Sequence, residues 1–279
     1  MRIAIVGASG FVGSRLGEFF SENEIVPIGR RETASKKLLQ ESLEDCDVII
    51  NLAGAPIATR WNEQYKKTLY YSRIDTTEKI VECIEDMDKK PLFISTSAVG
   101  RYRGGEVYSE YDEAYADNYL GKITKDWEDR ALSADKVTRV VVFRFGVVLG
   151  AGGGMLQKTL TPFKLGVGGV IGDGSQGFSW VHIDDIKNAM KFAIENKELK
   201  GVYNLTSPNP STNSEFTKKL GEVLNRPTIL PLPAFVVKMI FGEGSTVLLD
   251  GQKVVPKRLL ESGFEFKYSD LKEALKASV

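Results

Sequence analysis

The chain has 279 residues, 42% of them apolar and 27% charged, so it is long enough to bury the core of an ordinary globular protein. Lysine plus arginine and aspartate plus glutamate both total 37, and this balance excludes a strong overall attraction to nucleic acid or to an anionic membrane. Two cysteines and one histidine cannot supply a four-ligand Cys/His zinc site. From the charge balance, the few cysteine and histidine residues, and the lack of a secretory signal or of an apolar run of roughly 18 residues, we expect a cytoplasmic protein with no membrane, nucleic-acid or metal partner.

Residues 1–14 predict a strand, a glycine-rich turn and the start of a helix. Ile3 to Val6 are apolar, and glycines follow at positions 7, 10 and 13. The first glycine permits the tight turn, the second lets backbone N–H groups approach a pyrophosphate, and the third lets the helix pack close to the sheet. The helix N-terminus then faces the phosphates with unpaired N–H groups. The pattern favours a dinucleotide site over an ordinary turn, with contacts assigned to Gly7, Ser9, Gly10, Phe11, Val12 and Gly13.

A second predicted strand, from Glu24 to Ile28, ends at a pair of arginines. In a dinucleotide fold the residue about 20 positions after the glycine turn meets the adenosine ribose, where an acid binds the free 2′-hydroxyl and an arginine suits a 2′-phosphate. Arg30 stands 20 positions after Gly10, and no acid precedes it at the strand end. We therefore predict NADP(H) as the cofactor, with Arg30 and Arg31 on the 2′-phosphate. The alternative is a solvated basic turn that Glu32 balances.

Two further strands are predicted to end at the same edge of the sheet. Only 18 residues separate Ile28 from Asp47, too few for two crossovers with a full strand between them, so we expect a rudimentary third strand. The strand from Asp47 to Leu52 leads into small residues that either lie against a cofactor or form a tight turn: Leu52, Ala53, Gly54 and Ala55. A long helix is predicted over 62–88, and the next strand leads into Ser95, Thr96 and Ser97. Their hydroxyls lie where doubly wound sheets bind ligands.

The rest of the chain completes an α/β pattern. Residues 101–119 are tyrosine-rich and acidic and predict a loop, whereas ten glycines between 150 and 177 predict irregular backbone around a ligand. A helix over 120–132, a strand over 139–145, a helix over 186–195 and a strand over 201–205 are also expected. We predict a Rossmann-type doubly wound parallel sheet with a smaller C-terminal substrate lobe. The dinucleotide-binding core takes residues 1–150, completed by about 181–206, and the lobe takes 151–180 and 207–279.

Several motifs resemble the extended short-chain dehydrogenase/reductase superfamily, which contains the nucleotide-sugar epimerases and dehydratases. They include the glycine turn, Asn51-Leu-Ala-Gly-Ala-Pro-Ile57, Ser95-Thr-Ser97, Trp127-Glu128 and Arg144-Phe-Gly-Val-Val-Leu-Gly150. Within the superfamily the chain is most similar to the atypical branch named epimerase family protein. The resemblance implies the Rossmann-type fold and a nicotinamide cofactor, and it leaves the substrate unspecified.

The resemblance also implies a catalytic serine or threonine, together with a tyrosine and a lysine four residues apart on the following helix. Ser97 matches the hydroxyl position, and we assign Ser95 to cofactor contact. The tyrosine and lysine are missing: aligning Glu128 with the superfamily glutamate places Thr124 at the lysine position and Leu120 at the tyrosine position.

Two substitutes for the missing pair remain open. Tyr119 and Lys122 are three residues apart and share a helix face, and Tyr102 follows Ser97 by five residues. The alternative for both tyrosines is a packed or solvated aromatic ring, because a phenol with no nearby cation keeps a pKa near 10 and is a poor base.

Three residues are candidates for substrate contacts, namely Arg60, Trp61 and Arg73, because an arginine suits phosphate or carboxylate and tryptophan suits a flat ring. Surface ion pairing accounts equally well for the arginines. We expect His182 to be structural and Arg144 to pair with Asp184 or Asp185.

The sequence thus predicts an NADP(H)-dependent oxidoreductase or epimerase-like enzyme for a small polar substrate, including phosphate- or nucleotide-bearing molecules. The alternative is a non-catalytic NADP(H)-binding sensor or regulatory protein that has lost the Tyr–Lys pair. We expect a monomer or a homodimer.

Overall fold

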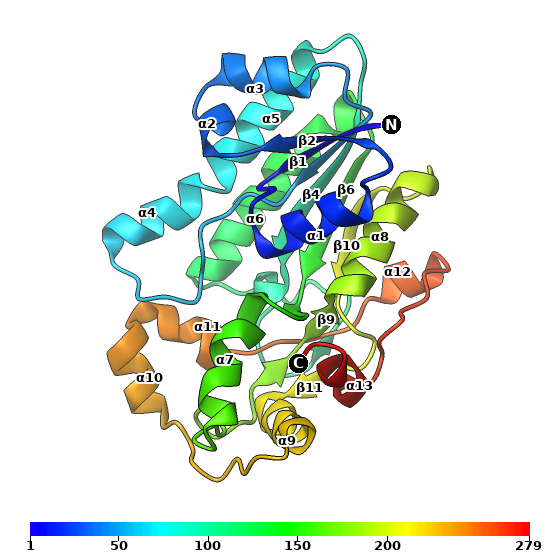
Figure 1. Cartoon of the computed structure of the whole chain (residues 1–279). Coiled ribbons are helices and arrows are strands. Elements are labelled where there is room, and N and C mark those ends of the chain that lie inside the picture. Colours follow the sequence, from blue (N-terminus) through cyan, green and yellow to red (C-terminus); the bar gives the residue numbers. More distant parts are fainter.

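A six-stranded parallel sheet forms the centre of the computed structural model, which describes residues 1–279 (Figure 1). Its strands lie in the order β10 (Gly201–Leu205), β6 (Val140–Phe145), β4 (Leu92–Ala98), β3 (Val48–Asn51), β1 (Arg2–Val6) and β2 (Glu24–Ile28). The strand order reverses between β1 and β3, which is the switch point of a doubly wound sheet. The predicted Rossmann-type fold is confirmed.

Helices cover both faces of this sheet, which explains why its strands are continuous apolar runs. On one face α1 (Phe11–Phe19) and α8 (Ile183–Glu195) bury Leu16 and Ile186 against Ile3 and Ile5. On the other face lie α3 (Lys36–Leu43), α5 (Ile74–Asp86) and α6 (Tyr119–Leu132). Alternate residues of β1 therefore belong to two separate hydrophobic clusters.

The predicted rudimentary strand between Ile28 and Asp47 is wrong, because the crossover between β2 and β3 consists only of the helices α2 (Arg30–Thr33) and α3. No strand lies beyond β2, which is the edge strand of the sheet. The predicted single helix over 62–88 is wrong, because the chain forms α4 (Glu63–Tyr71) and α5 with a break at Ser72 and Arg73. The Ser72 hydroxyl accepts a hydrogen bond from the Ala55 N–H, and Arg73 donates to the Leu69 carbonyl at the end of α4. These bonds end one helix and redirect the next.

The smaller lobe gathers at the carboxyl end of the sheet (Figure 1). It contains α7 (Gly154–Lys164), α9 (Asn213–Leu224), α10 (Ala234–Phe241), α11 (Thr246–Leu249) and α13 (Leu271–Lys276). Helix α7 lies inside the glycine-rich segment, so the prediction of irregular backbone was wrong there. In contrast, α12 (Lys257–Glu261) buries Leu259 in the cluster of the main sheet. No helix has the length and apolar content needed to cross a membrane.

The tyrosine-rich segment is more ordered than a loop. It contains β5 (Val107–Tyr108), which pairs in parallel with β12 (Lys253–Val254) from the far end of the chain. This pairing ties the segment after β4 to the C-terminal region, close to the carboxyl end of the sheet.

Glycines allow β1 and α1 to approach each other very closely. Gly7 has φ +86° and donates its N–H to the Ile28 carbonyl on β2. A Cβ atom on Gly13 would lie 2.4 Å from the Gly7 carbonyl oxygen and 2.8 Å from the Ala8 Cα atom. Both are backbone atoms that no rotamer change can move. The turn therefore excludes a side chain at position 13.

We predict that Gly13→Ala destabilises the protein by about 2 kcal/mol, because the added methyl group forces backbone apart. Gly17→Ala on the same helix is the matched control. A Cβ there meets nothing within 4 Å, so the better helix propensity of alanine should stabilise the protein by up to about 1 kcal/mol. Urea unfolding measures both changes. Equal shifts in the two variants would show that the close approach at Gly13 is absent.

The only histidine joins β9 (Trp180–His182) to α8. His182 is buried, its Nδ1 accepts a hydrogen bond from the Asp184 N–H at 3.2 Å, and its ring centroid lies 4.0 Å from that of Tyr268. Burial lowers the pKa of His182 from 6.5 to about 4. The side chain is a neutral helix cap in the structure, as expected for a structural residue.

This pKa predicts a loss of stability in acid. Between pH 6.5 and 4 the unfolded chain binds a proton at His182 that the folded chain does not, so stability falls as the pH falls through this range. The contribution lost between pH 7 and pH 5 is about 2 kcal/mol. His182→Asn keeps an acceptor for the helix cap and removes the titration. Urea unfolding at both pH values should show a smaller loss in the variant, and an unchanged loss would contradict the assignment.

Candidate functional site

The carboxyl ends of β1 and β3 bring the glycine turn beside the segment from Leu52 to Ala55. Val6 pairs with Asn51 in the parallel register, and a Cβ on Gly7 would lie 3.1 Å from the Leu52 carbonyl oxygen. Ser9 and Gly10 are exposed at this edge. No side chain caps the N-terminus of α1, so the N–H groups of its first turn remain available to an anion.

Two junctions hold the segment from Leu52 to Ala55 in place. The Asn51 side chain accepts a hydrogen bond from the Ala53 N–H at 3.1 Å, and the Ala55 carbonyl accepts one from Arg73 Nη2 at 2.9 Å. Ser95 lies beneath this segment rather than in the open edge: it is fully buried, and its hydroxyl accepts a 3.5 Å bond from Asn51 Nδ2. The backbone of this segment, unlike the Ser95 side chain, lies beside the glycine turn.

Arg30 and Arg31 project from the end of β2, next to the glycine turn. Both are exposed, and neither has a carboxylate within 4 Å. Glu32 forms no ion pair with either arginine within 4 Å, and its carboxylate accepts a 2.9 Å hydrogen bond from the Gly29 N–H. That bond lowers the pKa of Glu32, and the positive charge of Arg31 lowers it further. The two guanidinium groups are therefore free to bind an anion beside the turn.

A buried hydrogen-bond network surrounds Ser97. Its hydroxyl donates to Glu128 Oε1 at 2.7 Å, and Arg144 binds the same carboxylate through two nitrogens at 2.7 and 2.6 Å. Arg101 Nε lies 3.9 Å from Glu128 Oε2. Two arginines thus face one carboxylate, which leaves this part of the structure with an excess positive charge.

The predicted pairing of Arg144 with Asp184 or Asp185 is wrong. Asp184 is bound by Lys187 at 2.6 Å and Lys267 at 2.8 Å. The buried carboxylate of Asp185 accepts backbone N–H bonds from the 267–268 segment, and burial raises its pKa to about 6. The spacing of buried residues on α6 was the missed signal, since it places Glu128 on the inward face, where a carboxylate requires a cationic partner.

Tyr102 is enclosed rather than open to a ligand. Its phenol accepts a hydrogen bond from Arg144 Nη1 at 2.6 Å and donates to Asn204 Oδ1 at 3.1 Å. Burial raises the pKa of this phenol despite the neighbouring arginine. The Tyr102 side chain therefore links Arg144 on β6 to Asn204 on β10.

The structure does not bring Tyr119 and Lys122 together. The Tyr119 phenol donates to the Lys66 carbonyl at 2.5 Å, no hydrogen bond joins it to Lys122, and Lys122 is exposed. Burial raises the pKa of Tyr119 as well. At the position of the family lysine, the Thr124 hydroxyl donates to the Leu120 carbonyl of its own helix at 2.8 Å. Neither phenol has the lowered pKa that a tyrosine base requires.

Among the three substrate candidates, Arg73 contacts the segment from Leu52 to Ala55 directly. Its Cζ is 3.0 Å from where a Cβ on Gly54 would be, it packs 5.4 Å from the Trp127 ring, and no carboxylate lies within 4 Å. Burial lowers its pKa to about 10, so it remains charged at neutral pH. Arg60 instead donates to the Met239 carbonyl at 2.9 Å, and the buried Trp61 donates to Ile57.

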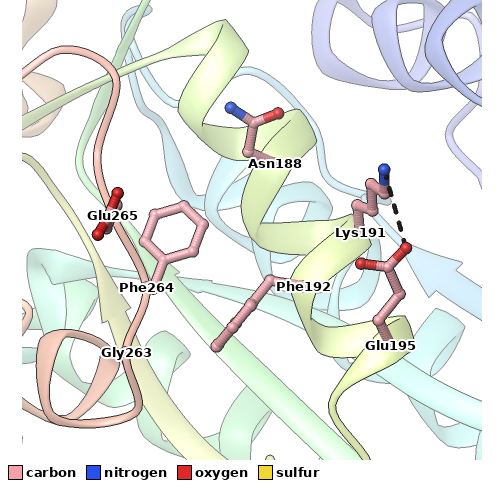
Figure 2. A pocket seen from close by; sticks show the side chains of 7 residues that line it. All are labelled: Asn188, Lys191, Phe192, Glu195, Gly263, Phe264 and Glu265. Atoms are coloured by element: carbon pink, nitrogen blue, oxygen red, sulfur yellow. Dashed lines mark ion pairs between the residues drawn. The ribbon is translucent and has the colours of Figure 1, made fainter.

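A shallow hollow of about 280 Å³ lies away from these residues (Figure 2). It is formed by α8 and the chain after α12, where Phe192 and Phe264 pack with ring centroids 5.5 Å apart. Lys191 and Glu195 face one another at its rim. The hollow contains none of the predicted site residues, so it does not change the assignment of the site.

Comparison with known proteins agrees with this architecture. The model of the NAD-dependent epimerase/dehydratase family matches residues 3–206, and a domain of unknown function matches residues 232–278. The chain is 38% identical to epimerase family protein SDR39U1 of Mus musculus over 291 residues, with 99% of both chains covered. It is 39% identical over 300 residues to the chloroplastic SDR39U1 homolog of Arabidopsis thaliana, which covers 99% of this chain and 86% of that relative.

Solved structures show the same fold. The crystal structure of human epimerase family protein SDR39U1 with NADPH superposes with a TM-score of 0.90 at 33% identity and covers 99% of this chain and 98% of that one. The nucleoside-diphosphate sugar epimerase from Corynebacterium glutamicum has a TM-score of 0.80 at 28% identity, over the whole of this chain and 58% of that one. Because the family model covers most of the sequence and its relatives align along nearly the full length, this chain belongs to the NAD-dependent epimerase/dehydratase family.

Proposed function

We propose that this protein is an NADP(H)-dependent oxidoreductase or epimerase-like enzyme for a small polar substrate. The observation that carries the cofactor choice is the pair Arg30 and Arg31, two exposed cations without a carboxylate partner at the end of β2. A 2′-phosphate matches such a pair, and the acid that would bind a free 2′-hydroxyl is missing from this strand end. The NADPH in the human relative's structure supports the same choice.

The residues present fit a dinucleotide along the switch point. The uncapped first turn of α1 offers N–H groups to the pyrophosphate, and the close packing at Gly7 and Gly13 keeps side chains out of its path. The backbone from Leu52 to Ala55 lies beside this turn and would contact the next part of the cofactor. When bound, NADP(H) supplies or accepts a hydride at the substrate carbon.

Ser97 and its network provide the polar surroundings for a substrate oxygen. Because the Ser97 hydroxyl donates its hydrogen bond to Glu128, its oxygen lone pairs are left to accept a hydrogen bond from a substrate hydroxyl. The excess positive charge from Arg101 and Arg144 stabilises negative charge that develops on such an oxygen. Arg73 would bind an anionic group of the substrate, since it is charged and faces no carboxylate.

A second candidate function has its own support. Both available phenols are hydrogen-bonded and have raised pKa values, and the family positions for tyrosine and lysine are filled by Leu120 and Thr124. This favours a protein that binds NADP(H) as a sensor and does not transfer a proton through tyrosine. Measuring NADPH oxidation against a panel of aldehydes, ketones and nucleotide sugars separates the two: turnover supports the enzyme, and tight NADPH binding without any turnover supports the sensor.

We predict that Arg30→Asp weakens NADPH binding by about tenfold to a hundredfold, because a charge-assisted hydrogen bond to the 2′-phosphate is lost. Binding of NADH should change little. Lys37→Asp on α3 makes the same change of charge at an exposed side chain and serves as the control. Nicotinamide fluorescence titrations of the wild type and both variants with NADPH and NADH measure the six affinities. A parallel loss for NADPH and NADH would remove Arg30 from 2′-phosphate recognition.

We predict that Ser97→Ala lowers turnover by about a hundredfold, because the substrate oxygen loses its hydrogen-bond partner. Binding of NADPH should be retained, since Glu128 keeps both bonds from Arg144. Thr96→Val, on the opposite face of β4, is the control because it also removes one buried hydrogen bond. Steady-state NADPH oxidation tests the prediction, and equal turnover in the two variants would exclude Ser97 from the reaction.

A further inference from the structure

The four most exposed large apolar side chains of the protein lie in one region of the smaller lobe. They are Ile229, Leu165, Phe235 and Met239, with exposed fractions of 79%, 73%, 70% and 65%. Val167, Leu230 and Ile240 extend the group. We call this region the α7–α10 surface: residues 164–172 after α7, the connection 225–233, and α10. Such a cluster needs an explanation, because single exposed apolar residues are common but a contiguous group marks an interaction site.

Hydrogen bonds hold the parts of the α7–α10 surface together. Gly172 donates to the Leu232 carbonyl at 2.9 Å, and Leu232 donates to the Val170 carbonyl at 2.8 Å. Arg226 Nε donates to the Lys164 carbonyl at 2.9 Å. Helix α10 is anchored by the fully buried Val237, which leaves Phe235 and Met239 outward, one turn apart. These hydrogen bonds tie together the backbone that carries the apolar side chains, which runs below α7 and along α10 in Figure 1.

The charge of this surface is one-sided although the whole chain has zero net charge. No acidic residue occurs between positions 137 and 172 or between 223 and 242. Lys164, Arg226 and Lys238 are exposed, and none has a carboxylate within 4 Å. Of the acids that border these stretches in sequence, Glu222 pairs with Lys272 at 2.7 Å and Glu243 with Lys66 at 2.9 Å. Asp173 is exposed and accepts hydrogen bonds from the Ser175 N–H and hydroxyl.

We propose that the α7–α10 surface docks the protein peripherally on an anionic lipid bilayer. Protruding apolar side chains enter the boundary between headgroups and acyl chains, while unpaired lysine and arginine side chains meet the negative headgroups. A second copy of the chain fits this surface poorly, because a symmetric contact would place its cations against identical cations. The proposal is independent of the cofactor site and replaces the expectation, drawn from the balanced net charge and the lack of a long apolar run, that membranes are not partners.

Vesicle flotation tests this proposal with the full chain. We expect wild-type protein to float with vesicles of phosphatidylcholine and phosphatidylglycerol in equal parts, and to remain behind with phosphatidylcholine alone. Lys238→Glu/Met239→Glu should reduce binding to the anionic vesicles by about tenfold or more, because it reverses one charge and removes one inserted side chain. Lys136→Glu/Val137→Glu is the control, because it makes the same kind of change at two consecutive exposed residues outside this surface. This variant should bind the anionic vesicles as the wild type does.

Three results would overturn the proposal. They are no flotation of the wild type with anionic vesicles at low salt, equal loss of binding in both double variants, or a wild-type dimer in light scattering that only Lys238→Glu/Met239→Glu dissociates. The last result would assign the surface to a second copy of the chain. NADPH titration of each variant verifies that the fold and the cofactor site are intact, so a failure here leaves the proposed function untouched.

Discussion

The approach of α1 to β1 is the constraint on which the site depends. Because Gly13 packs directly on the Gly7 carbonyl, the first helix starts immediately beside the sheet and its N-terminal N–H groups face the switch point. Gly7 also bonds to Ile28, which fixes the end of β2 next to the turn. The same short segment thus sets the positions of the α1 N-terminus and of Arg30, the two features on which the proposed NADP(H) site rests.

The buried Glu128–Arg144 pair organises the other half of the site. It joins α6 to β6 and receives Ser97 from β4, and through Tyr102 it reaches Asn204 on β10. A carboxylate buried without its arginine would carry a large penalty, so these elements are held in register by charge as well as by packing. The network offers a substrate an acceptor and positive charge, while both phenols nearby remain protonated. This chemistry differs from a tyrosine–lysine pair.

Sequence patterns predicted the local features and missed the long-range ones. The glycine turn, the strands and the end of β2 were predictable because they depend on neighbouring residues. The break between α4 and α5 at Ser72 and Arg73 was not predictable, since it depends on hydrogen bonds to Ala55, which lies 17 and 18 residues earlier in the sequence. Helix α7 was not predicted, because the glycines around its start are typical of irregular backbone. The partner of Arg144 was mispredicted because Asp184 and Asp185 at the start of α8 are also acidic candidates. The position of Glu128 on the inward face of α6 was, however, predictable from the spacing of apolar residues.

Parallel fluorescence titration of the purified wild-type protein with NADPH and NADH tests the central claim most directly, because it examines the glycine turn and the proposed contact of Arg30 and Arg31 with the 2′-phosphate together. Tight binding of NADPH with an affinity at least about tenfold higher than that of NADH is the predicted result, since only NADPH uses the unpaired arginines. Equal affinities, a preference for NADH or no binding of either nucleotide would contradict the assignment of Arg30 and Arg31 as an NADP(H) site.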